Sequence, residues 1–503
     1  MKYEPKTSPY GHQTEALRRS WMRDGYGYLM EMGTGKSKVI VDEMSALWEN
    51  GEIDTALVLA PKGVYGNWSS KEIPAHMPDR VRESAQVHLW TGGHTVRERA
   101  QFDKLCRPSS GLRLLVINTE SVATSAKAAE AIRRFLDSGR CYAAVDEAST
   151  IKNPSAQRTK FLITKVGRHP NTHFRRIATG SPVPRGPLDL WAQFEFLAPA
   201  CLGYRSYYPF RNTYGIVQRK EFGGRMVELV VGYRNVEELA ERISRHSFIM
   251  RKQDCLDLPP KVFVTRDVEL TDEQRRLYEE VRQWATAEIS AGRFVTATAV
   301  ITQLLRLHQI VCGYVVDENG EGHDVPTRRL DAMMEVVAEA SDKTIVWCTY
   351  RTDVQKVVDR LRREGRRVVE YHGGTSVDDR TMAVWRFQGT GNPEHPLWQW
   401  GPDGIVPPEE QVDDFVGTPH AGGYGITLTA AGTVIYYSNT YDLEKRAQSE
   451  DRAHRIGQTR SVTYVDLVAR NTVDEKIIQA LANKQQLADI IMAGPDAVRE
   501  LFT

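Results

Sequence analysis

The fold of this chain is constrained most strongly by two series of short apolar runs. Each run is followed by a longer amphipathic stretch. The first series, between Tyr10 and about Pro199, comprises residues 55–60, 112–118, 143–147 and 175–182. The second comprises residues 343–350, 366–372, 413–418, 433–438 and 462–468. Strands that alternate with amphipathic helices are typical of parallel sheets covered on both faces. The sequence therefore predicts an α/β chain of two doubly wound parallel-sheet lobes.

The region between the two series has a different character. It contains an aromatic and basic segment, a hairpin pattern around residues 222–225 and a long helical pattern over residues 271–289. Pro259 and Pro260 break the chain just before an apolar run and mark a joint there. We therefore expect a first lobe over residues 1–200, a mainly helical insertion over 201–327 and a second lobe over 328–503.

Two further segments belong to the second lobe. Residues 389–411 are rich in Gly, Pro and Trp and interrupt the lobe just before one of its strands. They are interpreted either as a surface loop with Trp398 and Trp400 folded onto the lobe, or as a contact to a substrate or partner. A last helix, from about Val473 to Met492, is expected to brace the lobe.

Composition limits the location and the partners of the protein. The chain of 503 residues has a net charge of +1, so nucleic acid would have to bind a local basic face rather than a global field. No stretch approaches the roughly twenty apolar residues of a membrane span, so we expect a cytoplasmic protein without a membrane partner. The six cysteines are scattered singly, which favours buried reduced thiols over a zinc site.

Residues 30–37 read as a glycine-rich turn that opens a helix. Gly33 and Gly35 would let backbone amides approach phosphate, Lys36 would supply a positive charge, and the hydroxyl of Ser37 would bind Mg²⁺. Met30 stands where the full phosphate-loop pattern has glycine. The preceding apolar run and the following helical pattern support a nucleotide site here.

Asp146 and Glu147 end a later strand of the same lobe. An acidic pair at a strand end is often a solvated turn. Beside a phosphate loop, however, Asp146 would hold magnesium through water and Glu147 would polarise the attacking water. The pair therefore predicts a nucleotide hydrolase.

Arg452 and Arg455 lie three residues apart near the carboxyl end. A helix that starts at Gln448 would direct both guanidinium groups to one point, where a polyanion could meet them. The alternative is the charged face of a surface helix. Because an arginine that stabilises a transferring phosphoryl group accelerates hydrolysis by about 10³ to 10⁵, we expect the two lobes to close on one nucleotide.

With these residues placed, the chain resembles the Swi/Snf-type ATPases of helicase superfamily two from Tyr10 to about Lys476. Eight segments carry the resemblance in the family's order: PYGHQ, EMGTGKS, LVLAPKGVYGNW, VDEASTIKNPSAQRTK, ATGSPVPRGPLDLWAQFEFL, IVWCTYRTDV, VGTPHAGGYGITLTAA and QSEDRAHRIGQ. Residues 233–261 look most like the compact annealing translocases, or like phage and bacterial members. Ser149, and Arg185 with Gly186, depart from the family's usual residues in its motifs two and three.

The resemblance implies the ligands and their contacts. ATP and Mg²⁺ would be the cofactors, with Gln13 reading the base and with Thr34, Gly425 and Gln448 also binding the nucleotide. Duplex DNA would be held by its phosphates through loops at the strand ends, which include Lys62, Thr119, Arg351 and Thr418.

The resemblance also implies the function. We expect a monomeric ATP-dependent double-stranded DNA translocase of a bacterial or phage-infected cell, which remodels forks, anneals strands or displaces proteins, with replication or repair proteins as partners. The alternatives are a strand-separating DNA or RNA helicase, a catalytically silent DNA-binding scaffold, and the motor subunit of a DNA defence system.

Overall fold

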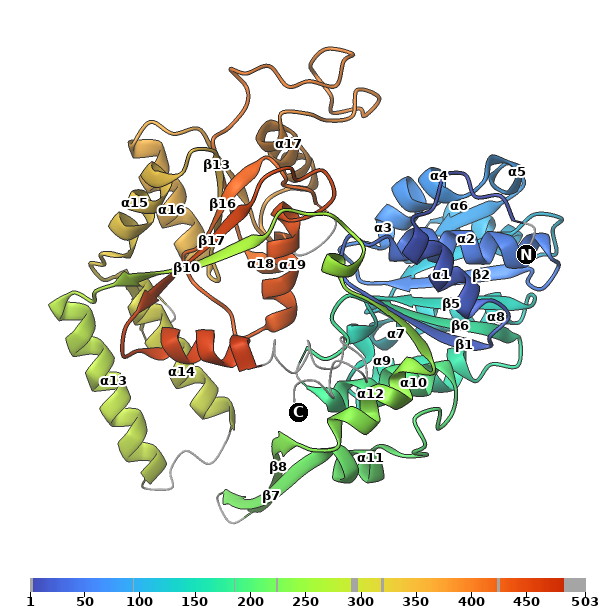
Figure 1. Cartoon of the computed structure of the whole chain (residues 1–503), viewed down its shortest axis with the longest axis horizontal. Coiled ribbons are helices and arrows are strands. Elements are labelled where there is room, and N and C mark those ends of the chain that lie inside the picture. The colour runs from blue at the N-terminus through green and yellow to red at the C-terminus, as the bar shows by residue number, and fades with distance from the viewer. Residues whose placement is uncertain are drawn as a thin grey trace. The chain divides into compact units, whose positions relative to one another are not determined.

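The chain forms two compact units, each of which is considered by itself. The computed structural model describes residues 3–93, 95–184, 186–222, 225–290, 297–317, 321–422 and 426–483 (Figure 1). Among these, unit 1 comprises residues 3–217 and 230–256, and unit 2 comprises residues 218–229 and 257–483. The region predicted as an insertion, 201–327, is thus divided between the two units, and its boundaries stay a prediction.

Unit 1 is built on a parallel sheet in the order β3-β4-β2-β5-β6-β1-β9. Its strands are β1 (Gly25–Met30), β2 (Thr55–Ala60), β3 (Gln86–Leu89), β4 (Arg113–Asn118), β5 (Cys141–Asp146), β6 (Thr172–Thr179) and β9 (Ser247–Met250). The apolar runs of the first series become β2, β4, β5 and β6. Since all strands are parallel, their carboxyl ends lie along one edge of the sheet.

Helices cover both faces of this sheet. They are α1 (Gly11–Ser20), α2 (Lys36–Glu49), α3 (Tyr65–Asn67), η1 (Trp68–Glu72), α4 (Ile73–His76), α5 (Asp79–Arg82), α6 (Val96–Leu105), α7 (Ser121–Thr124), α8 (Ala126–Leu136), η2 (Ala148–Ile151), α9 (Gln157–Phe161), η3 (Leu162–Gly167), η4 (Pro187–Asp189), α10 (Leu190–Leu197), α11 (Tyr207–Tyr214), α12 (Val236–Ser244) and η5 (Lys252–Asp254). As the pattern around residues 222–225 predicts, β7 (Gly215–Phe222) and β8 (Arg225–Tyr233) form a separate two-stranded sheet, of which residues 218–222 and 225–229 belong to unit 2.

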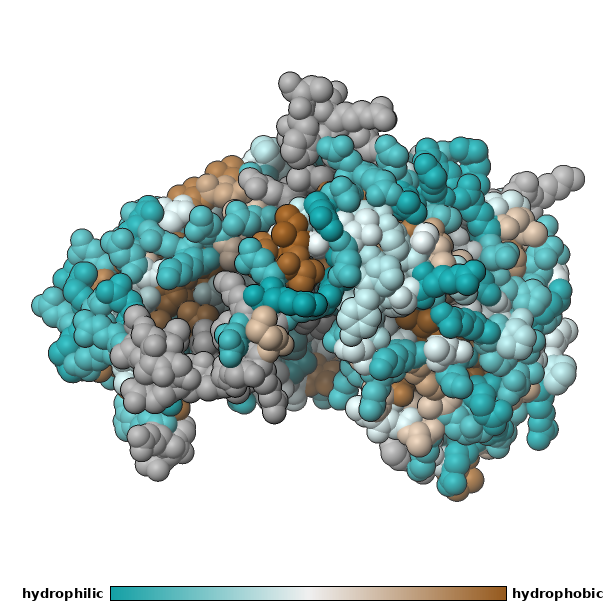
Figure 2. Space-filling view, turned by 90° about the horizontal axis from the view of Figure 1, so that it is seen from below, coloured by the Kyte–Doolittle hydropathy of each residue, from teal (hydrophilic) through white to brown (hydrophobic). Residues whose placement is uncertain are grey.

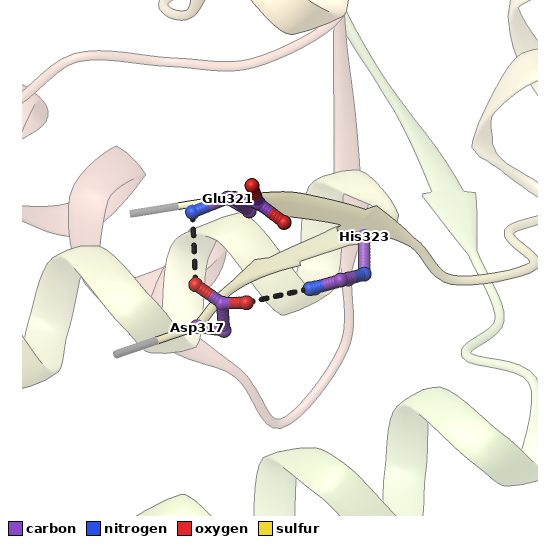
Figure 3. A group of neighbouring side chains, drawn as sticks. All are labelled: Asp317, Glu321 and His323. Carbon is purple, nitrogen blue, oxygen red and sulfur yellow. Dashed lines mark hydrogen bonds and ion pairs between the residues drawn. The ribbon is translucent and has the colours of Figure 1, made fainter. Parts of the chain in front are cut away.

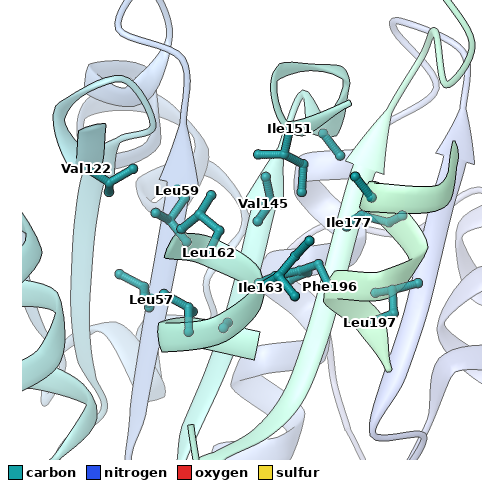
Figure 4. Packing of buried hydrophobic residues seen from close by; sticks show 14 of the residues in the cluster. Leu57, Leu59, Val122, Val145, Ile151, Leu162, Ile163, Ile177, Phe196 and Leu197 are labelled. Atoms are coloured by element: carbon teal, nitrogen blue, oxygen red, sulfur yellow. The ribbon is translucent and has the colours of Figure 1, made fainter. Parts of the chain in front are cut away.

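The core of unit 1 shows why the sheet needs cover on both faces. Leu57 and Leu59 of β2 enter one buried cluster together with Val145 and Ile177, where residues of η3 and α10 meet them (Figure 4). Val58, between the two leucines, enters a second cluster on the opposite face. Strands with apolar residues at successive positions are buried on both sides, which confirms the doubly wound arrangement.

Unit 2 repeats this plan with a six-stranded sheet in the order β10-β17-β16-β13-β15-β14, also parallel throughout. Its strands are β10 (Lys261–Val268), β13 (Lys343–Trp347), β14 (Val368–Tyr371), β15 (Asp414–Gly417), β16 (Ala431–Tyr436) and β17 (Val462–Ala469). A small hairpin of β11 (Tyr314–Val316) and β12 (Gly322–Asp324) stands outside the sheet. The predicted fold class, two doubly wound parallel sheets, is thereby confirmed.

The helices of unit 2 are α13 (Asp272–Ser290), α14 (Ala297–Cys312), α15 (Arg329–Glu339), α16 (Arg351–Arg363), α17 (Val377–Gln388), α18 (Pro419–Gly422) and α19 (Leu443–Ala453). Residues 473–483 are also helical. Val473, Ile477 and Leu481 pack in one cluster with apolar residues of α13, α14 and α19, as expected of a brace. The remainder of the predicted last helix lies outside the described residues.

The segment 389–411 folds as an anchored loop between α17 and β15. Trp398 packs edge-to-face on Trp385 of α17 at 5.4 Å and on Trp400 at 5.0 Å between ring centroids. A bridge between Thr390 and Ile405 closes the base of the loop. The folded-loop interpretation is therefore confirmed, while a contact to substrate or partner stays a prediction.

None of the helices in the described part of the chain combines the length and the apolar character that crossing a bilayer requires. Figure 2 shows one face, on which hydrophilic side chains predominate and hydrophobic ones gather in small groups.

Candidate nucleotide-binding site

The turn between β1 and α2 has the backbone geometry of a phosphate-binding loop. Gly33 and Gly35 adopt φ angles of +82° and +89°, which side-chain-bearing residues rarely adopt. A Cβ atom on Gly35 would lie 2.1 Å from Nε2 of Gln13. The left-handed conformation therefore favours glycine at position 35, directly before the first residue of a 14-residue helix, and the side chain of Gln13 occupies the space beside it.

Gln13 and His12 of α1 hold this turn from one side. Nε2 of Gln13 donates a hydrogen bond to the carbonyl oxygen of Thr34 at 3.1 Å, and Nε2 of His12 lies 2.8 Å from the same oxygen. The amide oxygen of Gln13 accepts from the backbone N–H of Tyr10 at 3.0 Å. Gln13 thus positions the turn, and its contact with the nucleotide base stays a prediction.

Lys36, which follows β1, and Asp146, which ends β5, both lie at this edge of the sheet. The ammonium group of Lys36 donates to the carbonyl oxygens of Met30 and Glu31 at 2.8 and 3.2 Å. Burial raises the pKa of Asp146, while the indole N–H of Trp68 and the charge of Lys36 act in the opposite direction. A nucleoside triphosphate site needs a lysine for the phosphates and a carboxylate for the metal ion. Lys36 and Asp146 have the charges for these two tasks.

Trp68 contacts Asp146, although the sequence analysis gave Trp68 no role in the site. Its indole nitrogen donates to Oδ2 of Asp146 at 2.9 Å, although 78 positions separate the two residues, and its side chain is 1 % exposed. The other oxygen of Asp146 accepts from the backbone N–H of Glu147 at 3.0 Å. These two bonds fix the orientation of the Asp146 carboxylate, and no local sequence signal reports the first of them.

Glu147 has a strained backbone. Its φ and ψ angles of 48° and 60° lie in the left-handed region, and the residue is 8 % exposed. A residue other than glycine held in this region carries about 1–3 kcal/mol of strain, which persists where the surrounding structure enforces it and is concentrated at active sites. The strain supports a functional role for Glu147 rather than a solvated turn.

A buried ionic cluster fixes α2 against the sheet behind the turn. Arg176 of β6 donates two hydrogen bonds to Glu43 of α2 at 2.6 and 2.8 Å, and both side chains are fully buried. Hydroxyl groups of Tyr28 and Tyr142 donate to the same carboxylate. Burial alone would raise the pKa of Glu43, but Arg176 outweighs it and holds the pKa below its usual range. These bonds therefore fix the position of α2, whose amino terminus forms part of the phosphate site.

The donor set of unit 1 fits a magnesium ion. Asp146 offers carboxylate oxygens, each with a lone pair beyond its one hydrogen bond, and Ser37 is the second residue of α2 and half-buried. Mg²⁺ prefers hard oxygen ligands and keeps several waters, so two protein groups near phosphate suffice. Ser37 and Asp146 would hold the ion in this site.

The arginine pair of unit 2 requires a correction. The sequence predicts a helix that starts at Gln448 and carries both arginines, whereas α19 begins at Leu443 and ends at Ala453, before Arg455. The side chain of Asp442 caps the helix by accepting from the N–H groups of Glu444 and Lys445. The helix therefore starts one turn earlier than predicted, and only Arg452 lies on it.

The two guanidinium groups nevertheless converge. Nη1 of Arg452 and Nη1 of Arg455 each donate to the carbonyl oxygen of Ile426, both at 3.2 Å. The nonhelical backbone of His454 brings Arg455 back to this point. The predicted convergence is confirmed, but a shared backbone acceptor produces it rather than helical spacing.

The other nucleotide-site predictions in unit 2 have different outcomes. The Gln448 side chain is 1 % exposed, and Nε2 donates to Glu444 of the same helix at 3.1 Å. Gln458, which ends the same motif, donates to the carbonyl oxygens of Thr429, Ala431 and Ala453 and so links the two motifs. Gly425 lies outside the described residues.

The residues predicted to contact DNA follow the carboxyl ends of strands in each unit. In unit 1, Lys62 is exposed after β2, whereas Oγ1 of Thr119 after β4 is buried and has no hydrogen-bond partner among the described residues. In unit 2, Arg351 is exposed at the start of α16 and Thr418 is 8 % exposed after β15. Their contacts with DNA stay predictions.

The departures in motifs two and three lie close to the same edge. Ser149 is buried in η2, three residues after Asp146. Gly186 leaves no room for a side chain, because a Cβ atom there would lie 2.1 Å from the hydroxyl oxygen of Tyr233. Arg185 lies outside the described residues.

A buried carboxyl group, that of Asp353, supports the first turn of α16, where Arg351 lies. Oδ2 of Asp353 accepts from the hydroxyl of Ser438 at 2.7 Å, and that hydroxyl accepts from the N–H of Thr349 at 2.8 Å. Burial raises the pKa of Asp353 to about 7, although the Ser438 hydrogen bond and the charges of Arg329 and Lys356 lower it in part.

Asp353→Asn should therefore change how stability depends on pH. The folded state binds the Asp353 proton more tightly than the unfolded state, where the pKa is about 3.9, so this group destabilises the fold as the pH rises from about 4 to about 7. The variant should match the wild type at pH 4 and exceed it at pH 8 by up to about 4 kcal/mol. Urea unfolding across this range measures the difference, and a constant offset would contradict the prediction.

A further group of potential metal ligands belongs to the β11–β12 hairpin (Figure 3). Asp317 accepts from the backbone N–H of Glu321 at 2.8 Å, and its other oxygen lies 2.9 Å from Nε2 of His323. These bonds close the hairpin and account for the proximity of the three residues. We assign no metal to them.

The fold and the site together define a phosphate-loop nucleotide-binding protein. They combine two parallel sheets, a glycine turn before α2, and Lys36 and Asp146 at one sheet edge. A profile of the SNF2-related domain family matches residues 12–314, which is more than half of the chain. The chain therefore belongs to the SNF2-related domain family, within the ATPases of helicase superfamily two. The resemblance to Swi/Snf-type ATPases that the motifs indicate is thereby confirmed.

Individual relatives are much longer proteins. An uncharacterized ATP-dependent helicase of Mycoplasma pneumoniae is 26 % identical over 97 % of this chain and 42 % of its own length. Protein Chromatin Remodeling 24 of Arabidopsis thaliana is 25 % identical over 94 % of this chain and 45 % of its own length. The chain thus spans less than half of these relatives. The solved SWI2/SNF2 ATPase core of Sulfolobus solfataricus in complex with double-stranded DNA is 23 % identical, with a TM-score of 0.40 over 100 % of this chain and 96 % of that one.

Proposed function

We propose that the protein is an ATP-dependent double-stranded DNA translocase of the Swi/Snf type. It would hydrolyse ATP to ADP and phosphate while it moves along or remodels DNA. The observation that carries this proposal is the glycine turn in left-handed conformation directly before the amino terminus of α2, with Lys36 and Asp146 at the same edge of the parallel sheet.

In unit 1 the chain supplies most of the phosphate chemistry. Backbone N–H groups of the turn and of the first turn of α2 bind phosphate oxygens, and Lys36 exchanges its two carbonyl acceptors for the phosphates of ATP. Glu147, held by its strained backbone, orients and polarises the attacking water. Mg²⁺ bound near Ser37 and Asp146 would neutralise phosphate charge.

We further infer that unit 2 completes the site. Arg452 and Arg455 already point to a common acceptor, the oxygen of Ile426, so a phosphoryl group can replace that oxygen without a large rearrangement of either side chain. ATP favours closure of the two units because only the closed state lets both sets of residues bind one nucleotide. Hydrolysis removes that preference, and the units part.

DNA would be gripped through its backbone. Lys62 and Arg351, which follow strand ends in unit 1 and unit 2, would contact phosphates, and Thr418 would do so beside Arg351. Thr119 would contribute only after the loop that follows β4 opens, because its side chain is 0 % exposed. Contacts of this kind position a protein without reading sequence. Alternating grip by the two units would produce stepping along the duplex.

The nucleic-acid preference tests this function. We expect double-stranded DNA to stimulate ATP hydrolysis more than single-stranded DNA or RNA does. The stimulation should weaken steeply between about 50 and 200 mM salt, because phosphate contacts dominate the affinity. Phosphate release measured with plain duplex, forked DNA, single-stranded DNA and RNA gives the comparison.

The other outcomes of the same panel point to other functions. Equal or greater stimulation by RNA would favour an RNA helicase of the same superfamily. Hydrolysis with no response to any nucleic acid would contradict the translocase, and no hydrolysis at all would favour a DNA-binding scaffold. Co-purification of a nuclease would instead indicate the motor subunit of a DNA defence system.

A further inference from the structure

The short peptide between the last residue of unit 1 and the first strand of unit 2 contacts the segment that carries the two arginines. The chain passes from unit 1 to unit 2 between Leu256 and Asp257, and β10 begins at Lys261. Nε2 of His454 lies 2.7 Å from the carbonyl oxygen of Pro259. A carbonyl oxygen only accepts, so Nε2 of His454 donates this bond. We use the term hinge peptide for residues 257–261.

Lys261 makes a second connection to the same segment. Its ammonium group lies 3.0 Å from Oε2 of Glu450 and 3.4 Å from Oδ1 of Asp451, both in the last turns of α19. Burial would lower the pKa of Lys261, but the two carboxylates outweigh it and raise the pKa above its usual range. Arg446 in turn donates to Glu450 at 2.8 Å. The end of α19 is thus fixed to the first residue of β10.

His454 occupies the position that decides where Arg455 lies. It is 7 % exposed, it ends α19 with φ and ψ angles of −99° and 83°, and it stands between Arg452 and Arg455 in the chain. Its backbone conformation returns Arg455 to the oxygen that Arg452 also contacts. The bond to Pro259 therefore holds the residue whose conformation sets the separation of the two guanidinium groups.

We propose that His454 and Lys261 are positioning residues that fasten the hinge peptide to the segment carrying Arg452 and Arg455, so that the hinge conformation sets where both guanidinium groups lie. In this role neither residue has to touch the nucleotide. This inference rests on the proposed function. It adds that the movement that closes the two units also moves both arginines into place.

Two substitutions at His454 separate positioning from folding. His454→Leu keeps a side chain of similar volume but removes the donor, whereas His454→Gln keeps an N–H group at a similar reach. We expect His454→Leu to lower kcat of DNA-stimulated ATP hydrolysis about tenfold to a hundredfold, because a misplacement of about 1 Å costs that much. KM for ATP should stay within about threefold, and His454→Gln should retain most of kcat.

Lys261 provides an independent test with a matched control on the same strand. Lys261→Met should lower kcat as His454→Leu does. Arg266→Met removes a cation that also lies on β10 but pairs with Glu339 of α15 at 2.6 Å, and it should leave kcat within about twofold. Thermal unfolding of each variant shows that it is folded at the assay temperature.

The outcomes distinguish this inference from the proposed function. A wild-type kcat in both His454→Leu and Lys261→Met, beside an inactive Arg455→Ala, would overturn the positioning role alone. Equal losses in His454→Gln and His454→Leu, or a loss in Arg266→Met as large as in Lys261→Met, would overturn it too. Absence of hydrolysis in the wild type would overturn both.

Discussion

Replacing Arg455 by alanine is expected to lower DNA-stimulated ATP hydrolysis by about 10³-fold or more while the protein remains folded. A guanidinium group that meets the transferring phosphoryl group stabilises charge that develops only in the transition state, and such arginines accelerate hydrolysis by about 10³ to 10⁵. We propose this role for Arg455 together with Arg452, since both donate to the oxygen of Ile426 at 3.2 Å. Phosphate release at saturating ATP and duplex DNA measures the loss.

Arg460 supplies the control for this experiment. It lies five residues further along, its side chain is 59 % exposed, and it pairs with Asp342 at 2.7 Å. An exposed pair of this kind contributes little to stability, so Arg460→Ala should behave as the wild type. Normal turnover in Arg455→Ala would remove Arg455 from the site.

Lys36→Ala should abolish measurable hydrolysis and weaken ATP binding. Its ammonium group is held by two carbonyl oxygens at the end of β1 and acts on the carboxylate of Asp146, so its loss removes the one side-chain cation of the phosphate turn. Removing a single preorganised charge donor costs about 10² to 10³ in rate, and the loss of nucleotide affinity adds to it. Fluorescent-nucleotide titration and phosphate release measure the two effects separately.

Lys38 distinguishes a local effect on ATP from a general effect on α2. It lies two residues further along the same helix, where it pairs with Asp42 at 2.8 Å, and both side chains are buried. Lys38→Ala should lower the free energy of unfolding, because it removes the cationic partner of a buried carboxylate that then keeps only its hydrogen bond from Tyr3, but a folded variant should bind ATP normally. Equal ATP affinity in Lys36→Ala and the wild type would contradict the assignment of the phosphate turn.

The strands could be predicted because their signal is local. Residues 56–60 are apolar at every position, and together with Thr55 they form β2 with the bounds that were predicted, since a strand covered on both faces needs no polar alternation. The same reasoning located β13 and β17. The order of strands in each sheet could not be read this way, because it depends on contacts between distant segments.

The site could be predicted in its residues but less well in its geometry. The glycine turn can be recognised in the sequence from its residue types. The contacts of Trp68 with Asp146 and of Arg176 with Glu43 cannot, because 78 and 133 positions separate the partners. The convergence of Arg452 and Arg455 was inferred from helical spacing, yet Asp442 starts the helix early and His454 ends it before Arg455. Tertiary contacts, among them the bond from His454 to Pro259, determine that geometry.

In the proposed mechanism, residues of both units act on one triphosphate. Trapping of ADP with aluminium fluoride, which mimics the transferring phosphoryl group, tests it most directly. The wild type should retain the trapped complex in the presence of duplex DNA, whereas Arg455→Ala should bind ADP with an affinity within about threefold of the wild type but lose the trapped complex. Trapping by Arg455→Ala at the wild-type level would show that unit 1 acts on the phosphates without the arginines of unit 2.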